Sequence, residues 1–113
     1  MKCYKVVRYN KRSAVVTKRA AVRYSTSCYV SAPEFLRLKG RHLSAFKTLE
    51  AARDYVNARR YLIYAADGRE KVRRRPILSP YGISDGEFYE GMMDNWPDGT
   101  VFFKRIKLIK RIK

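Results

Sequence analysis

The sequence contains one clear amphipathic helical pattern with short strand-like segments on both sides, which limits the fold to a mixture of helix and sheet. Residues Leu43–Phe46 show the apolar alternation of a strand, and a helical pattern begins directly after them. Thr48 is a suitable N-cap, because its hydroxyl accepts hydrogen bonds from the first free amides of a helix, and Glu50 suits the positive helix end. One face carries Leu49, Ala52 and Val56, with Tyr55 beside them. We therefore predict a main helix over residues 48–58.

Short segments rich in β-branched residues surround this helix. Residues 3–8, 13–17, 20–24 and 28–30 read as strands bounded by polar residues, as in a meander or small barrel. Pro33 is tolerated in the first turn of a helix, which predicts a short helix over residues 33–38 that ends before Gly40.

The second half of the chain predicts a hairpin and a closing strand. Residues 61–66 and 70–78 read as two strands joined by a turn at Asp67-Gly68. Ser84 and Glu87 fit the capping box of a short helix that ends near residue 94. A turn at residues 95–99 precedes the tail, 101–113, which fits a strand or a helix; its β-branched residues favour a strand that closes the sheet.

Together these elements predict one α+β domain spanning residues 1–113. Its core is a small, twisted, mostly antiparallel sheet or partial barrel, with the main helix at 48–58 and one or two short helices. A chain of 113 residues supports a modest core, and 46% hydrophobic residues argue against disorder.

The net charge of +16, from 26 basic and ten acidic residues, points to a polyanionic partner. Repulsion on this scale destabilises the compact state unless the charge is solvated or met by a polyanion, and nucleic acid is the commonest one. No apolar run approaches the roughly 20 residues of a spanning helix, so we expect no membrane partner. The first residues lack the apolar core of a signal peptide, which predicts a cytoplasmic location, in the host cell if the protein is viral.

No pattern in the sequence indicates catalysis, a cofactor or a metal. Cys3 and Cys28 form neither a zinc motif nor a disulfide framework. His42 is the only histidine, and no nucleophile motif accompanies it. The acids of the window 76–103, which holds five of the ten acids and no Lys or Arg, are better explained by helix starts than by metal binding. We therefore expect a non-enzymatic protein without cofactor or metal.

The distribution of basic residues gives the candidate binding surface. Residues 1–33 hold eight Lys or Arg and no acid, residues 71–75 form a dense cluster, and six more bases follow from residue 104. On neighbouring strands they would merge into one positive face that attracts phosphates. The predicted phosphate contacts are Arg8, Lys11, Arg12, Lys18, Arg19, Arg23, Arg73, Arg74, Arg75, Lys104 and Lys107. The candidates for stacking on unpaired bases are Tyr4, Tyr9, Tyr24 and Tyr29.

A purely structural interpretation accounts for the same residues. The Lys and Arg side chains would be solvated, and the Tyr rings would belong to a half-buried core. The run 73–75 would then protect a strand edge against unwanted pairing, which we weigh equally with phosphate contact.

Three stretches give the chain a resemblance to small uncharacterised proteins of phage and prokaryotic-virus type. They are the strand-like YKVVR at residues 4–8, the stretch from Gly40 to Val56, and WPDGTVFF at residues 96–103. The shared motifs are structural, so no activity is implied for individual residues. The resemblance implies a small virus-encoded accessory protein, including one that blocks a host defence.

The function predicted from these features is non-enzymatic binding of nucleic acid. RNA or single strands are slightly favoured over duplex DNA, because tyrosines are abundant and no helix-turn-helix is evident. One alternative is a protein-binding inhibitor or anti-defence factor that occupies a host protein complex. Another is a receptor for a small anionic nucleotide, which would show as a pocket lined by Arg and Tyr.

Overall fold

The computed structural model describes residues 1–13, 22–38, 42–56, 61–72 and 98–113. These ranges contain five strands and two helices. In chain order they are β1 (Lys2–Val7), β2 (Val30–Ser31), α1 (Glu34–Arg37), β3 (Leu43–Phe46), α2 (Leu49–Val56), β4 (Leu62–Val72) and β5 (Thr100–Arg111).

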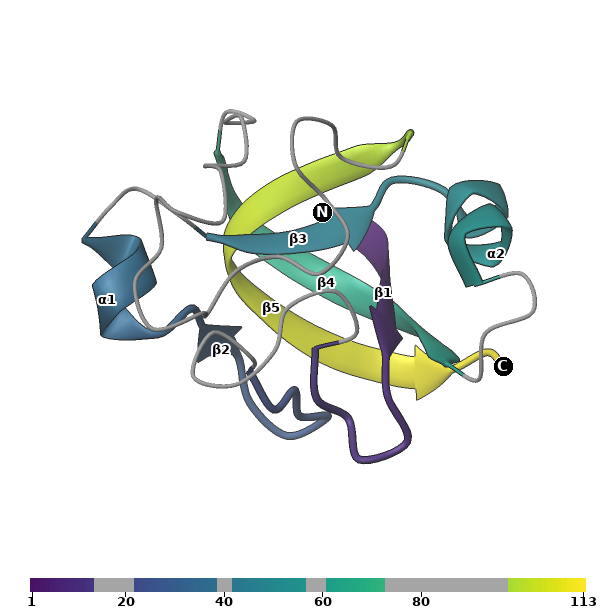
Figure 1. Ribbon diagram of the computed structural model, residues 1–113, viewed down its shortest axis with the longest axis horizontal. Helices are drawn as coiled ribbons and strands as arrows, with labels where there is room; N and C mark the ends of the chain where they lie inside the picture. The colour runs from purple at the N-terminus through teal and green to yellow at the C-terminus, as the bar shows by residue number, and fades with distance from the viewer. Residues whose placement is uncertain (14–21, 39–41, 57–60, 73–97) are drawn as a thin grey trace, which may run out of the picture.

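Four of these strands form a closed antiparallel barrel. The order is β5-β3-β1-β4, and β4 pairs with β5 to close it, while β2 adds to β5 on the side of β3. In Figure 1, β5 is the long curved strand that runs from green to yellow, and α1 and α2 lie at opposite ends of the long axis. The predicted α+β architecture with a partial barrel is confirmed.

Side-chain alternation separates an interior core from an outer one. Each of the four barrel strands contributes buried residues to the interior, among them Cys3, Leu43, Tyr64 and Phe103. The outer faces of β1, β3 and β4 carry Val6, Phe46 and Ile63, which pack against Ala52 and Val56 of α2. Because neighbouring residues of a strand point to opposite faces, β1 contributes to both cores.

The helix that the sequence predicted at 48–58 is present as α2. The amide of Ala51 donates to the Thr48 hydroxyl at 3.1 Å, so the predicted N-cap is confirmed. Ala52 and Val56 are buried, with Leu49 and Tyr55 packed beside them, as the apolar face predicted. The predicted short helix at 33–38 is also present, as α1.

The predicted hairpin at Asp67-Gly68 is wrong, because β4 runs unbroken through both residues. Residues 62–67 pair with β1, and β4 pairs with β5 from residue 64 to residue 72. The Asp-Gly pair therefore marks the point where pairing with β1 ends, while pairing with β5 continues. Gly68 is needed there for space, since a Cβ atom at this position would lie 2.5 Å from the ring of Phe103.

The tail predicted as a strand is confirmed as β5. A register shift opposite Ala65 and Ala66 leaves Ile109 as the extra residue of a bulge. Residues 28–30 lead into the short β2. Most of the predicted strand 13–17 and the first two residues of the predicted strand 20–24 lie outside the described residues. The described residues there form two isolated β-bridges, Val7 with Ser13 and Arg12 with Arg23. The predicted strand 70–78 is described only to residue 72, and the predicted helix at 84–94 lies outside the described residues.

Candidate nucleic-acid interface

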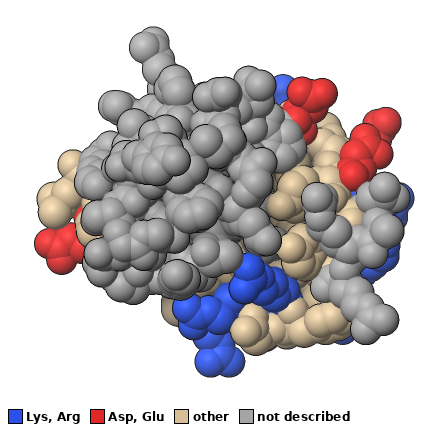
Figure 2. Space-filling model, viewed as in Figure 1, with Lys and Arg blue, Asp and Glu red and all other residues tan. Residues whose placement is uncertain are grey.

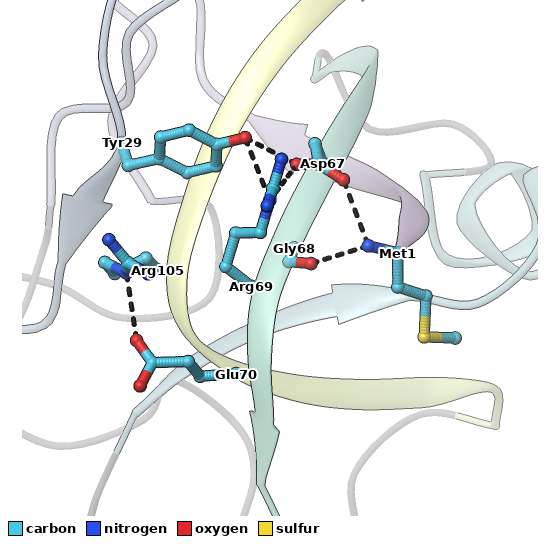
Figure 3. Close-up of polar contacts among 7 residues, drawn as sticks. All are labelled: Met1, Tyr29, Asp67, Gly68, Arg69, Glu70 and Arg105. Atoms are coloured by element: carbon cyan, nitrogen blue, oxygen red, sulfur yellow. Dashed lines mark hydrogen bonds and ion pairs between the residues drawn. The ribbon is translucent and has the colours of Figure 1, made fainter.

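Three cations from two strands surround one tyrosine ring next to β2. The Arg69 and Arg105 Cζ atoms lie 5.4 and 5.8 Å from the centroid of the Tyr29 ring, and the Lys107 Nζ lies 5.4 Å from it. We call these four residues and Asp67 the Tyr29 cluster; Figure 3 shows it without Lys107. Cations at such distances are attracted to the electron-rich ring face. The arrangement concentrates positive charge around a half-buried aromatic ring.

The two arginines of the cluster lie directly opposite each other in the β4–β5 ladder. Like charges at opposed positions of a sheet repel, so this pair disfavours the fold unless other groups compensate it. Two acids do so: Arg69 Nε lies 2.6 Å from Asp67 Oδ2, and Arg105 Nε lies 3.0 Å from Glu70 Oε2. Both arginine side chains remain about half exposed, at 58% and 49%. Because Nε makes these contacts, the terminal guanidinium nitrogens are left for other acceptors.

Asp67 is the centre of the polar contacts in the cluster. The Tyr29 hydroxyl donates to Asp67 Oδ2 at 2.5 Å, and Arg69 Nε lies 3.1 Å from that hydroxyl. The amino group of Met1 donates to Asp67 Oδ1 at 3.0 Å and to the Gly68 carbonyl at 2.8 Å (Figure 3). The hydrogen bond from Tyr29, followed by those from Arg69 and the amino group, holds the pKa of Asp67 well below its usual range. These bonds fix the position of the ring and of one guanidinium.

We expect Asp67→Asn to lower the free energy of unfolding by about 1 kcal/mol at pH 7, because charge-assisted hydrogen bonds become neutral ones. The folded-state pKa of Asp67 is below its unfolded value, so this stabilisation is present above about pH 4 and is lost as pH falls further. Urea unfolding at pH 7, 5 and 3 measures it, and the difference between the two proteins should be smaller at pH 3 than at pH 7. Glu70→Gln, which alters an exposed ion pair on the same strand, is the control. Equal stability of the Asn variant and the parent at pH 7 would contradict this role.

A second group of cations lies at the turn of residues 8–13 and the segment that faces it. The backbones of Arg12 and Arg23 form an isolated antiparallel β-bridge. Next to it, the Tyr24 amide donates to the Lys11 carbonyl at 2.8 Å. Figure 2 shows Lys and Arg together at the lower edge of the molecule, on the side where this turn lies in Figure 1. Acidic residues lie at other places on that face, including the upper right, toward α2. On the described part of this face, basic and acidic side chains thus lie in different places.

Six of the eleven predicted phosphate-contact residues lie within the described ranges. Arg12, Arg23 and Lys104 are exposed, while Arg8, Lys11 and Lys107 are half-buried. The structure brings Lys11, Arg12 and Arg23 together at the turn and places Lys107 in the Tyr29 cluster. The other predicted contacts, Lys18, Arg19, Arg73, Arg74 and Arg75, lie outside the described residues.

The four candidate stacking tyrosines have different environments. Tyr9 is 67% exposed and Tyr29 is half-buried among cations. Tyr4 is half-buried and packs with the core beneath α2. Tyr24 is only 3% exposed and belongs to the interior core, so its ring offers no face to a base. The prediction of base stacking is therefore wrong for Tyr24, because its ring is packed in the core.

The sequence interpretation missed Arg69 and Arg105. Neither is among the predicted phosphate contacts, although Arg105 belongs to the six bases that follow from residue 104. What distinguishes Arg69 and Arg105 from other bases is the register of β4 against β5, which places them opposite each other and next to Tyr29. Register between strands about 35 residues apart depends on the closed barrel, and local periodicity does not encode it.

Neither a membrane-spanning helix among the described residues nor a related protein helps to assign the function of this chain. Within the described ranges, no helix is long and apolar enough to cross a membrane. The resemblance to phage and prokaryotic-virus proteins stays a prediction. No known protein family, curated protein or solved structure matches this chain.

Proposed function

We propose that this protein binds nucleic acid without catalysis, with RNA or single strands favoured over duplex DNA. The observation that carries the proposal is the cross-strand pair of Arg69 and Arg105 beside Tyr29 and Lys107. Asp67 and Glu70 pair with the two arginines through Nε, and the terminal guanidinium nitrogens of these half-exposed side chains are left to bind the phosphates of a polyanion. Release of condensed counterions from the neutralised phosphates adds to the driving force.

Aromatic rings among the cations favour single strands over duplex. An unpaired base stacks on a tyrosine face, whereas the bases of a duplex are already stacked on each other. Tyr29 lies within the cation cluster, and the exposed Tyr9 lies in the basic turn at residues 8–13. The binding path would therefore extend from that turn to β5.

The described helices are poorly suited to reading duplex DNA. A recognition helix enters the major groove with basic and polar side chains toward the phosphates and bases. The longer helix, α2, has eight residues and exposes Glu50 and Asp54 next to Asp98. These carboxylates would repel the phosphates on either side of the groove.

Binding to labelled oligonucleotides across a salt series tests the proposal. We expect tighter binding of single-stranded RNA than of duplex DNA, with a log–log salt dependence that corresponds to about five or more phosphates. The double variant Arg105→Gln/Lys107→Gln removes two cations and leaves the Asp67–Arg69 contact in place. It should lower the magnitude of the slope for single strands by about 1.4, at about 0.7 per phosphate contact.

The matched control is Lys47→Gln/Arg53→Gln, which removes the same charge from exposed positions at and before α2. This control should keep the parent slope. If both double variants reduce the slope equally, the charge acts generically and the proposed interface is wrong. Binding that disappears near physiological salt and ignores the form of the strand would rule out nucleic acid as the ligand. An acidic protein partner, the alternative raised by the sequence, would then be sought.

A further inference from the structure

A shallow pocket opens between the basic turn and the loop before β2. Its volume is about 370 Å³, and its described lining includes Lys11, Arg23 and the run Ser25, Thr26, Ser27 and Cys28. We infer that it binds a phosphate monoester, as found at the end of a nucleic-acid strand or on a mononucleotide. This inference rests on the proposed function and specifies which chemical group of the nucleic acid the pocket binds. We call this pocket the hydroxyl pocket.

The chemistry of the lining matches a dianionic phosphate. A monoester carries a charge between −1.5 and −2 at neutral pH and has three acceptor oxygens, whereas an internal phosphodiester carries a single charge. Lys11 and Arg23 supply two positive charges, and the described lining contains no acid. Three successive hydroxyl residues add uncharged donors. Within the described part of the chain, the side chains of Lys11, Arg23 and Thr26 make no hydrogen bond or ion pair.

Hydrogen bonds hold both walls of the pocket in place. On one side, the Tyr24 amide donates to the Lys11 carbonyl at 2.8 Å. On the other side, the Leu108 amide donates to the Ser25 carbonyl at 2.9 Å, which fixes the loop to β5. The Ser27 amide donates to the Ser25 hydroxyl at 2.9 Å and shapes the turn between them. Donors that are already positioned bind an anion with less loss of conformational entropy.

Lys11 occupies a backbone conformation that favours glycine. Its φ is +64°, in the left-handed region that β-turns usually fill with Gly or Asn. Its amide donates to the Arg8 carbonyl at 2.8 Å, so the tight turn is formed despite the side chain. The presence of lysine at this strained position is explained if its ammonium group binds the ligand of the pocket, since strained positions concentrate at binding sites.

The residues of the hydroxyl pocket and of the Tyr29 cluster are neighbours in the chain and along β5. Cys28 lines the pocket, and Tyr29 follows it in the chain. The Ser25 carbonyl accepts a hydrogen bond from the amide of Leu108, which follows Lys107 in β5. A strand whose terminal phosphate occupied the pocket would thus continue toward Tyr29, Lys107 and Arg105. The pocket would fix the end of the strand, and the cluster would hold the nucleotides that follow.

Fluorescence anisotropy with one short single-stranded RNA tests this inference. The RNA carries a 5′-phosphate, a 3′-phosphate or hydroxyls at both ends, with the dye placed internally. We expect one phosphorylated form to bind about tenfold tighter than the hydroxyl form, as charge-assisted hydrogen bonds to one phosphate provide. Calorimetric titration with a nucleoside monophosphate and with inorganic phosphate tests whether the pocket also binds a phosphate that is not part of a strand.

The variant Lys11→Gly separates binding from folding. Glycine suits the φ of +64°, so the variant should be at least as stable as the parent, yet it should lose most of the preference for the phosphorylated end. Arg23→Gln should lose the preference as well. Lys47→Gln, at an exposed position before α2, should keep it. Thermal unfolding of each variant confirms that the folded protein is being titrated.

Each outcome separates this inference from the proposed function. A preference for a phosphorylated end that depends on Lys11 supports both. Equal binding of all three RNAs, with no binding of the monophosphate, overturns the pocket and leaves the proposed function standing. Binding of the monophosphate that Lys11→Gly abolishes, in a protein that binds no RNA, supports the pocket and overturns the proposed function.

Discussion

Replacement of Gly68 by alanine should lower the free energy of unfolding by about 3 kcal/mol, at the upper end of the usual cost of overpacking a core. A Cβ atom at residue 68 would lie 2.5 to 2.6 Å from three atoms of the Phe103 ring. That ring is fully buried inside the barrel, so it has no room to withdraw. Urea unfolding followed by circular dichroism measures the loss.

A double-mutant cycle with Phe103→Leu identifies the cause. Leucine removes the atoms that the new methyl group meets, so Gly68→Ala should cost at least 1 kcal/mol less in that background than in the parent. Lys71→Ala, at an exposed position of the same strand, should change stability by no more than about 0.5 kcal/mol. Additive costs of the two core substitutions would show that the effect of Gly68→Ala arises elsewhere, for example from the backbone.

Replacement of Lys5 by methionine should raise the free energy of unfolding by about 2 kcal/mol at pH 7. Lys5 is only 6% exposed and shares the interior face of β1 with Cys3 and Val7. Its ammonium group donates to the Ser44 carbonyl and lies 4.8 Å from the centroid of the Tyr24 ring. Desolvation by burial lowers the pKa of Lys5 from 10.5 to about 8. This shift means that burial of the charged form costs about 3 kcal/mol of folding free energy at pH 7. The lost hydrogen bond and ring contact offset about 1 kcal/mol of the gain.

The pH dependence of stability gives this prediction a second test. Between about pH 8 and 10.5 the unfolded chain holds a proton on Lys5 that the folded protein has released, so stability rises with pH. Cys3 acts in the opposite sense: burial raises its pKa from 9.0 to about 11, so stability falls from pH 9 to 11. The parent should therefore gain stability from pH 8 to 9, change little up to about pH 10.5, and then lose stability.

Two variants separate the contributions to that curve. Lys5→Met should remove the rise and leave a decline that begins near pH 9, whereas Cys3→Ala should extend the rise to about pH 10.5. Lys2→Met, at an exposed position of the same strand, should keep the shape of the parent curve. A Lys5→Met variant that is less stable than the parent at pH 7 would refute the desolvation argument. It would mean that the bonds of the ammonium group outweigh its burial.

How far the fold could be predicted is clearest from α2 and β5. The N-cap at Thr48, the acid at Glu50 and the apolar face of Ala52 and Val56 are all local features, and each is present in the structure. The strand at Thr100–Arg111 was favoured by its β-branched residues for the same local reason. Such elements are predictable because the interactions that define them join residues a few positions apart.

The hairpin at Asp67-Gly68 failed because a local signal was overridden by distant contacts. Asp-Gly is a strong turn pattern, but Gly68 faces the Phe103 ring and Asp67 bonds with Tyr29 and Arg69. Tyr24 and Lys5 show the same limit: one was proposed for base stacking, and both lie in the barrel interior.

Local patterns in the sequence are enough to predict a small, strongly basic α+β protein, the position of its main helix, and the tyrosines and bases from which a binding surface could be built. Contacts between distant segments bring together Arg69 and Arg105 around Tyr29, and Lys11 and Arg23 at the hydroxyl pocket. These contacts depend on closure of the barrel. Pairing of β4 with β5 fixes a register over residues far apart in the chain, and that register determines which side chains share a face.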